Sequence, residues 1–267
     1  MNLLAFDTST DTLSIAVQRG VGAAVWHHSG PGGAQASTTL IPAIQQMMQQ
    51  AGLTFAQLDA IAFGRGPGSF TGLRTACSVA QGLAFGAGVP VLPVDSLMAV
   101  AEDARAQYAN DTDDTGVQQR SDAPASTGAP ARMQVMALLD ARMDELYAER
   151  FDFDGALWTS NGPCRLHRAE DLAADFAVLP AGALAATTLL GGNVFAHYGQ
   201  RLPAGAWPRI QALPCARAML RLAPQLLRAG LAVPADQALP LYIRDKVAKT
   251  TQERLLEKSA AALPAPV

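Results

Sequence analysis

The sequence predicts an α/β protein built from two modest domains. Three observations support this expectation. The first part of the chain has the order strand, strand, strand, helix, strand, helix, strand, helix. That order predicts a three-stranded antiparallel meander extended by parallel strands through crossover helices. A second segment from Met133 opens in the same way, and 267 residues with 49% hydrophobic and 16% charged side chains can bury a sizeable core.

The elements of the first half follow from hydrophobic periodicity. Alternating or continuous apolar runs predict strands, and apolar residues at helical spacing predict helices. Gly52 closes the first long helix, and Thr54 with Gln57 has the spacing of a capping box. The expected strands are 2–7, 12–18, 22–28, 58–64 and 88–94, and the expected helices are 38–52, 71–85 and 96–107.

The second half repeats the strand–acid–strand opening, because an apolar run ends at Asp140 and an alternating strand follows. This hints at an internal duplication. Pro224 is expected to kink or divide the last helix. The expected strands are 133–140, 146–151 and 187–193, and the expected helices are 168–176 and 215–230.

Domain boundaries follow from composition. We expect an N-terminal domain over 1–105 and a smaller one over 106–245, with helix 215–230 packing back on the first. The polar segment 109–132 is expected to be a flexible insertion, and the tail 246–267 to be partly disordered.

The stretch GRGPGSFTGLR, residues 64–74, lies between an expected strand and helix. It lacks the Gly-Lys-Ser/Thr ending of a P-loop and does not read G-x-G-x-x-G. Two interpretations remain. The backbone N–H groups at the helix start could hold an anion, or the glycines allow a tight turn with close backbone approach. The candidate anion-site residues are Asp7, Ser9, Gly66, Gly68 and Ser69.

Acidic side chains raise a similar pair of alternatives. Asp7 ends the first strand beside hydroxyls, so it either holds a hydrated Mg²⁺ or caps a hairpin turn. Asp140, Asp144 and Glu145 are the matching acids of the second half, for metal or acid–base work or for a solvated turn. The four histidines form no H-x-x-x-H or H-E-x-x-H motif, so no zinc or iron site on one helix face is expected.

The helix after the glycine-rich stretch carries small residues at i, i+4 spacing, namely Gly72, Ala76, Ala80 and Ala84. Such a ridge lets another element approach closely. That element is either the chain's own core or a helix of a partner.

Composition narrows the function classes. The net charge of −3 gives no sign of a free-standing nucleic-acid binder. Three widely spaced cysteines are expected to be buried small hydrophobes in a reducing cytoplasm, and the alternative is a catalytic thiol. No signal peptide and no membrane span are expected, so we predict a cytoplasmic protein.

Four stretches together resemble the bacterial TsaB (YeaZ) family: LLAFDTSTDTLSIAV, AFGRGPGSFTGLRTACSVAQGLAFG, ALLDARMDELYAE and PLYIRDKVAKT. The resemblance implies an α/β fold of two actin-like (ASKHA, ribonuclease-H-like) domains, with mixed sheets flanked by helices. It also implies an accessory subunit of the machinery that makes threonylcarbamoyladenosine in tRNA. Such a subunit pairs with a larger catalytic relative, TsaD, that carries the metal site, and a small ATPase, TsaE, completes the complex.

What the family implies for this chain is a non-catalytic, metal-free subunit that requires no cofactor, although the complex can bind ATP or ADP. Contacts with tRNA are expected mainly through the partners, and a homodimer can form by the same helices. The implied interface residues, from helices 36–50 and 71–85, are Leu40, Ile44, Met47, Gly72, Leu73, Ala76, Ala80, Leu83 and Ala84. The main alternative is an autonomous ATPase or kinase-like enzyme of the same fold. A third reading, a metallopeptidase, is disfavoured by the absence of a histidine pair.

Overall fold

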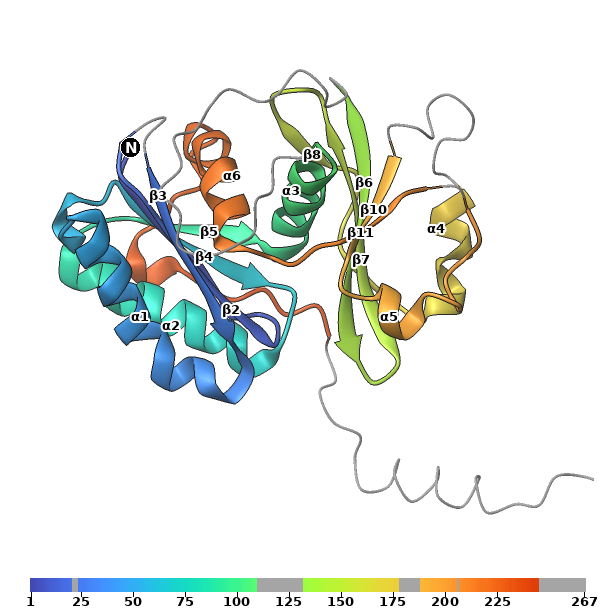
Figure 1. The fold of residues 1–267 in the computed structure, drawn as a ribbon, viewed down its shortest axis with the longest axis horizontal. Helices are drawn as coiled ribbons and strands as arrows, with labels where there is room; N and C mark the ends of the chain where they lie inside the picture. Colours follow the sequence, from blue (N-terminus) through green and yellow to red (C-terminus); the bar gives the residue numbers. More distant parts are fainter. Residues whose placement is uncertain (21–23, 110–131, 178–187, 206, 245–267) are drawn as a thin grey trace, which may run out of the picture.

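The structure is a computed structural model, and it describes residues 1–20, 24–109, 132–177, 188–205 and 207–244. The expected insertion lies outside this part of the chain except for its end residues, and the expected tail 246–267 lies wholly outside it. Two lobes are built around two sheets (Figure 1). The α/β fold class predicted from the sequence is confirmed.

The first sheet has the strand order β3-β2-β1-β4-β5. Its first three strands form the expected antiparallel meander, and β4 and β5 extend it in parallel. The strands are β1 Leu3–Asp7, β2 Thr12–Gln18, β3 Val25–Pro31, β4 Ala60–Gly66 and β5 Val91–Asp95. Strand β3 ends at Pro31, three residues beyond the expected end, because this edge strand is only partly buried and continues through polar residues. Residues 22 and 23, which were also expected in this strand, lie outside the described residues.

The second sheet has the order β11-β10-β6-β7-β8, with β9 also paired to β7. Here β6 takes the place of β1, β7 and β8 pair antiparallel in sequence, and β10 and β11 are added in parallel. The strands are β6 Met133–Arg142, β7 Glu145–Phe153, β8 Trp158–Ser160, β9 Arg165–His167, β10 Thr188–Gly192 and β11 Arg209–Gln211. The two sheets therefore share one topology, which is what the repeated opening of the sequence hinted at.

Helices cover the outer faces and fill the space between the sheets (Figure 1). The pair α1 and α2 packs on one face of the first sheet, and α3 and α6 lie against its other face, toward the second lobe. The helices are α1 Ala36–Ala51, α2 Phe70–Ala87, α3 Ser96–Tyr108, α4 Ala173–Ala177, α5 Phe195–Tyr198 and α6 Ala216–Arg228. Short 3-10 turns are η1 Gly33–Gln35, η2 Phe55–Gln57, η3 Ala169–Leu172 and η5 Ala235–Gln237. At η2 the expected capping box is present, with the Gln57 side chain accepting from the Thr54 backbone N–H at 2.8 Å.

Of the two effects expected of Pro224, a kink or a division, the division is wrong, since α6 runs through Pro224 as one helix. The apolar face of α6 is deeply buried, and tertiary packing of that face outweighs the backbone hydrogen bond that proline removes. Within the described residues no helix is both long and apolar enough to cross a bilayer.

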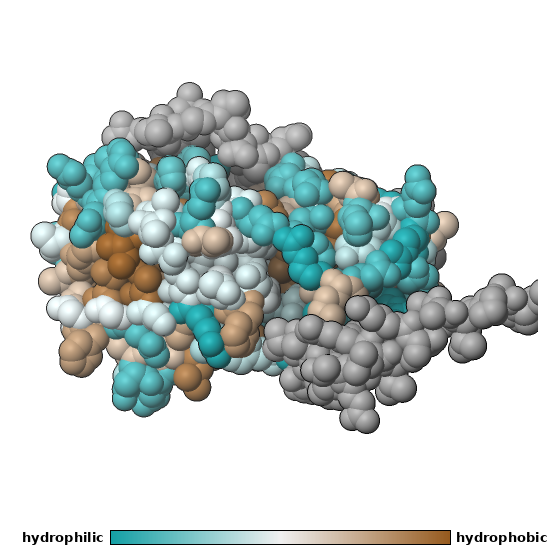
Figure 2. All heavy atoms as spheres, turned by 90° about the horizontal axis from the view of Figure 1, so that it is seen from below, coloured by the Kyte–Doolittle hydropathy of each residue, from teal (hydrophilic) through white to brown (hydrophobic). Residues whose placement is uncertain are grey.

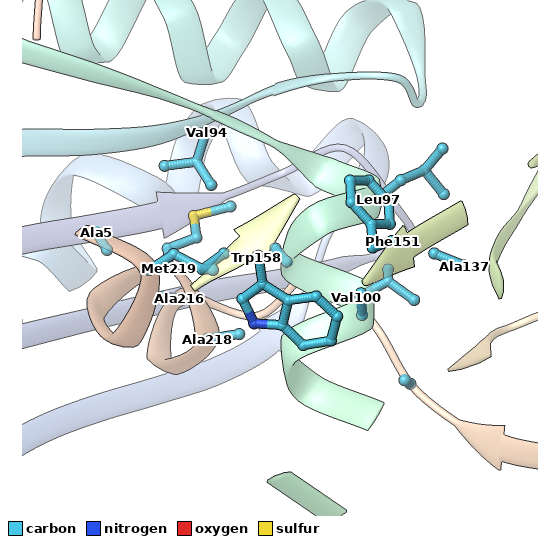
Figure 3. Packing of buried hydrophobic residues seen from close by; sticks show 14 of the residues in the cluster. Ala5, Val94, Leu97, Val100, Ala137, Phe151, Trp158, Ala216, Ala218 and Met219 are labelled. Carbon is cyan, nitrogen blue, oxygen red and sulfur yellow. The ribbon is translucent and has the colours of Figure 1, made fainter. Parts of the chain in front are cut away.

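One hydrophobic cluster joins the two lobes. Met219 of α6 and Val94 of β5 lie on the side of the first sheet, and Phe151 and Trp158 come from the second sheet, with α3 between them (Figure 3). Because this core is continuous, α3 and α6 hold the two sheets in a fixed position relative to each other. The α1–α2 side has a separate core.

Candidate partner-binding helices and interdomain cleft

The glycine-rich stretch forms the sharp connection from β4 to α2. The Gly66–Pro67 peptide bond is cis, and Ser69, in extended conformation, is the residue before the first turn of α2. The Ser69 N–H donates to the Ser9 carbonyl at 2.7 Å, and the Ser69 carbonyl accepts from the Leu73 N–H at 2.9 Å. The connection is thus bonded to the turn that follows β1.

Glycine is needed in this connection for close approach. A Cβ at position 68 would lie 2.6 Å from the Ser9 carbonyl oxygen, and one at position 72 would lie 1.8 Å from the Thr8 carbonyl oxygen. The Thr8 hydroxyl donates to the Gly72 carbonyl at 2.7 Å. These contacts favour the tight-turn interpretation of the stretch over a phosphate cradle.

Asp7 is completely buried where β1 ends. Its Oδ1 accepts from both the backbone N–H and the hydroxyl of Ser9, each at 2.7 Å. Its Oδ2 has no hydrogen-bond partner among the described residues and faces Gly64, where a Cβ would lie 1.8 Å away. Burial raises the pKa of Asp7 to about 7, and the bonds from Ser9 oppose that rise. Asp7 therefore caps the turn and points into the protein interior.

A cavity of about 330 Å³ lies between the lobes at the same end of the sheets. Of the candidate anion-site residues, Ser9, Gly68 and Ser69 line it, whereas Asp7 and Gly66 do not. Asp140, expected to match Asp7, also lines it. Three of the five candidate residues thus share the wall of one cavity, and the other two do not reach it.

The acids of the second half do not converge on one point. Asp140 Oδ1 accepts from the Tyr198 hydroxyl at 3.0 Å, which helps burial raise the pKa of that tyrosine to about 12. Asp144 pairs with Arg201 at 2.5 Å, and Glu145 pairs with Arg244. Among the described residues no group of three or more His, Cys, Asp or Glu side chains is placed to hold a metal ion.

Three cleft residues had no role in the sequence interpretation. Arg142, at the tip of the β6–β7 hairpin, forms an ion pair with Asp11 across the cleft. Tyr242 lies on the C-terminal segment that runs from the first lobe to the second (Figure 1), and its hydroxyl accepts from Arg74 Nε at 3.1 Å. Arg244, farther along, reaches Glu145. For Tyr242 and Arg244 the sequence signal is the segment PLYIRDKVAKT, in which both residues lie. Its pattern does not predict which residues they contact.

The helices implied as a partner interface present other side chains than expected. The ridge of small residues faces the chain's own core, so the core alternative is correct for it. Of the nine expected interface residues only Leu83 is partly exposed. The buried ones are Leu40, Ile44, Met47, Gly72, Leu73, Ala76, Ala80 and Ala84. Small residues serve here to bring α2 against the β1 turn and its own sheet.

The outward face of α1 and α2 is nevertheless apolar in part. The Phe85 side chain is 84% exposed on α2, and Ile41 is 42% exposed on α1. Gly82 and Gly86 flank Phe85, and a Cβ at either would meet nothing within 4 Å. Figure 2, which views the molecule from the side of these helices, shows brown, hydrophobic patches on this lobe. We call Ile41, Gly82, Phe85 and Gly86 the outer face of α1–α2.

Comparison with known proteins gives consistent matches. The family model described as TsaD, tRNA N6-adenosine threonylcarbamoyltransferase, matches residues 31–252. A solved structure of YeaZ from Pseudomonas aeruginosa superimposes with a TM-score of 0.72 and 32% identity, covering 90% of this chain and 99% of that one.

Two curated relatives carry the name tRNA threonylcarbamoyladenosine biosynthesis protein TsaB. The protein from Escherichia coli is 28% identical over 93% of this chain and 96% of its own length. The protein from Haemophilus influenzae is 36% identical over 55% of this chain and 52% of its own length. The match to the second relative thus spans about half of either protein.

Proposed function

Because this chain belongs to the TsaB (YeaZ) family and has the accessory role in tRNA threonylcarbamoyladenosine biosynthesis, we propose that it acts as a non-catalytic subunit docking a TsaD-like transferase. The docking surface we propose is the outer face of α1–α2. The observation that carries this proposal is the exposure of Phe85 between two open glycines.

The Phe85 ring is 84% exposed, and exposed apolar surface is unfavourable in water. Covering the ring with a partner would therefore lower the free energy and favour binding. Gly82 and Gly86 leave the helix backbone accessible on both sides of the ring. A partner helix can therefore approach closely and accept the Phe85 ring between its own side chains. Ile41 is a second exposed apolar side chain, on the neighbouring helix α1.

The absence of catalysis in this subunit is also a proposal. The polar groups at the base of the cleft are engaged with each other: Ser9 donates twice to Asp7, and the Ser69 N–H donates to Ser9. A carboxyl with a pKa of about 7 that faces the interior is poorly placed to hold a hydrated cation. We therefore assign the transfer chemistry to the partner.

The remaining parts of the proposal follow from the family role. A TsaE-like ATPase completes the complex, ATP or ADP binds to the complex, and tRNA is held mainly through the partners. The chain works in the cytoplasm. A homodimer formed by the same helices would compete with the TsaD-like subunit, because both use one surface.

Co-purification with the TsaD-like protein of the same organism tests the docking surface. Phe85→Asp and Gly82→Arg should each lower the yield of complex at least tenfold, because each places a charge in the apolar contact. Leu157→Asp, at an exposed apolar position in the second lobe, is the matched control and should keep the wild-type yield. Retention of the complex by both α2 variants would show that another surface docks the partner.

A further inference from the structure

A second cavity lies between α3, α6 and the β7–β8 hairpin, with a volume of about 170 Å³. Three arginines line it, Arg105 from α3 and Arg221 and Arg228 from α6, together with the carboxylate of Glu102. We call these four residues the arginine pocket. None of them has a part in the docking surface or in the interdomain cleft.

The single carboxylate of the pocket is fully occupied. Glu102 Oε2 accepts from Arg105 Nε at 2.8 Å and from the Trp158 indole at 2.9 Å. Its Oε1 accepts from Arg105 Nη2 at 2.9 Å and from Arg221 Nε at 2.5 Å. Four donors thus hold the Glu102 side chain, and it is fixed in the wall of the cavity.

The arginine pocket carries more positive than negative charge. Three guanidinium groups face one carboxylate in the lining. A second carboxyl, Asp103, lies behind the pocket and is bonded to Gln107, to the Leu213 N–H and to Cys215. Even if Asp103 is counted as ionised, the arginines exceed the acids by one charge.

Unused donors accompany this charge. A guanidinium has five N–H donors. The bond to Glu102 uses one donor of Arg221, and the bond to the Pro224 carbonyl at 3.0 Å uses one donor of Arg228. Arginine on rigid helices, with donors in a planar fork, is the side chain best suited to phosphate oxygens.

We propose that the arginine pocket binds a phosphate group, carried either by an RNA backbone or by free phosphate. The cavity, with a volume of about 170 Å³, is large enough for a tetrahedral anion with ordered water. Arg221 is held by Glu102 and Arg228 by its own helix, so the donors are preorganised.

The position of the pocket favours RNA as one source, a step that rests on the proposed function. Helices α3 and α6 pack on the face of the first sheet opposite to α1 and α2. In Figure 1 the two pairs lie on different sides of that sheet. A partner on the outer face of α1–α2 therefore leaves the arginine pocket open to tRNA.

Binding of fluorescently labelled tRNA to the full chain, measured by anisotropy over a range of salt concentrations, tests the RNA source. Arg228→Gln should weaken binding about three- to tenfold at low salt and lower the slope of log K against log salt by about one. Arg168→Gln, which removes one exposed arginine from the second lobe, is the charge-matched control and should have a smaller effect. Arg228 is chosen over Arg221 because Arg221 also pairs with buried Glu102.

A thermal-shift measurement with sodium phosphate, against sodium chloride at equal ionic strength, tests free phosphate. Phosphate should raise the melting temperature of the wild-type chain and of Arg168→Gln more than that of Arg228→Gln. The proposal is supported if Arg228→Gln, but not Arg168→Gln, loses tRNA affinity or the phosphate-induced rise in melting temperature. The assay in which the loss occurs identifies the source of the phosphate group. If Arg228→Gln equals the wild type in both assays, or if Arg168→Gln loses as much, the proposal is overturned. Co-purification with the TsaD-like protein should be unchanged in both variants, so a failed docking surface is distinguished from a failed pocket.

Discussion

The α-carbon of Gly72 in α2 packs directly on the carbonyl oxygen of Thr8, so closely that a Cβ at position 72 would lie 1.8 Å from that oxygen. The Thr8 hydroxyl returns a hydrogen bond of 2.7 Å to the Gly72 carbonyl. This contact joins the start of α2 to the turn after β1. It sets where the glycine-rich connection and the exposed half of α2 lie.

The contact predicts that Gly72→Ala destabilises the chain by about 1–3 kcal/mol, because the new methyl group would clash with the Thr8 backbone carbonyl, which cannot move aside. Gly82→Ala is the matched change in the same helix, where the new methyl group meets nothing within 4 Å. It should stabilise by about 0.5–1 kcal/mol through helix propensity. Urea denaturation of both variants measures the difference, and equal effects would contradict the close contact.

Asp7 predicts a pH dependence of stability. Its pKa is raised by burial from 3.8 to about 7 in the folded chain. The folded state therefore holds a proton that the unfolded state has released between these values. The stability contribution of this carboxyl is fully present below about pH 4 and is lost as the pH rises to about 7. Asp7→Asn, which stays neutral, should lose less stability between pH 4 and 7.5 than the wild type.

The measurement is the free energy of unfolding at a series of pH values, compared between wild type and variant. The measurement needs a control for Glu149, because burial also raises the pKa of Glu149 to about 7 and gives a pH dependence in the same range. Glu149→Gln should remove a separate part of the slope, and the double variant should combine both. Parallel curves for wild type and Asp7→Asn would show that Asp7 does not take up a proton on folding in this range.

Removal of the buried charge of Glu102 should strongly lower the free energy of unfolding. Burial alone would raise its pKa, but the bonds from Arg105 and the nearby charge of Arg221 outweigh burial and lower it. Glu102→Gln would leave two guanidinium groups without their carboxylate, so we expect a loss of about 3–5 kcal/mol in unfolding free energy. Glu145→Gln removes a more exposed acid from its ion pair and should cost at most about 1 kcal/mol. A loss for Glu102→Gln no larger than that for Glu145→Gln would mean that the pair is fully solvated.

Most of the fold could be predicted from the sequence because its elements carry strong periodic patterns. Strands β1 and β2 read as apolar runs ending at Asp7 and beginning at Thr12, as the structure has them. The sequence places the end of β3 too early, because an edge strand needs no apolar face. Pro224 predicts a kink or a division of α6, and the helix is not divided because burial of its apolar face outweighs one lost backbone hydrogen bond.

The site was predicted less well, for a physical reason. Small residues pack closely against a partner or against the chain's own sheet, and spacing alone does not distinguish the two. Ala80 and Ala84 face inward, and the outward face is marked by Phe85, which the sequence does not distinguish from a core aromatic. The direction in which Asp7 points depends on Gly64, far along the chain, and no local pattern encodes it.

The engaged polar groups of the cleft predict that the isolated chain does not turn over ATP. Ser9 uses its N–H and its hydroxyl on Asp7, the Ser69 N–H donates to the Ser9 carbonyl, and the Asp7 carboxyl points away from the cleft. These groups are therefore not available to a triphosphate. Phosphate release with ATP and Mg²⁺ should therefore equal that of a blank, and calorimetry should show weak binding at most. The control is Ser9→Ala, which should leave phosphate release at the same level. Clear turnover by the wild type that Ser9→Ala abolishes would instead support an autonomous ATPase that uses this cleft.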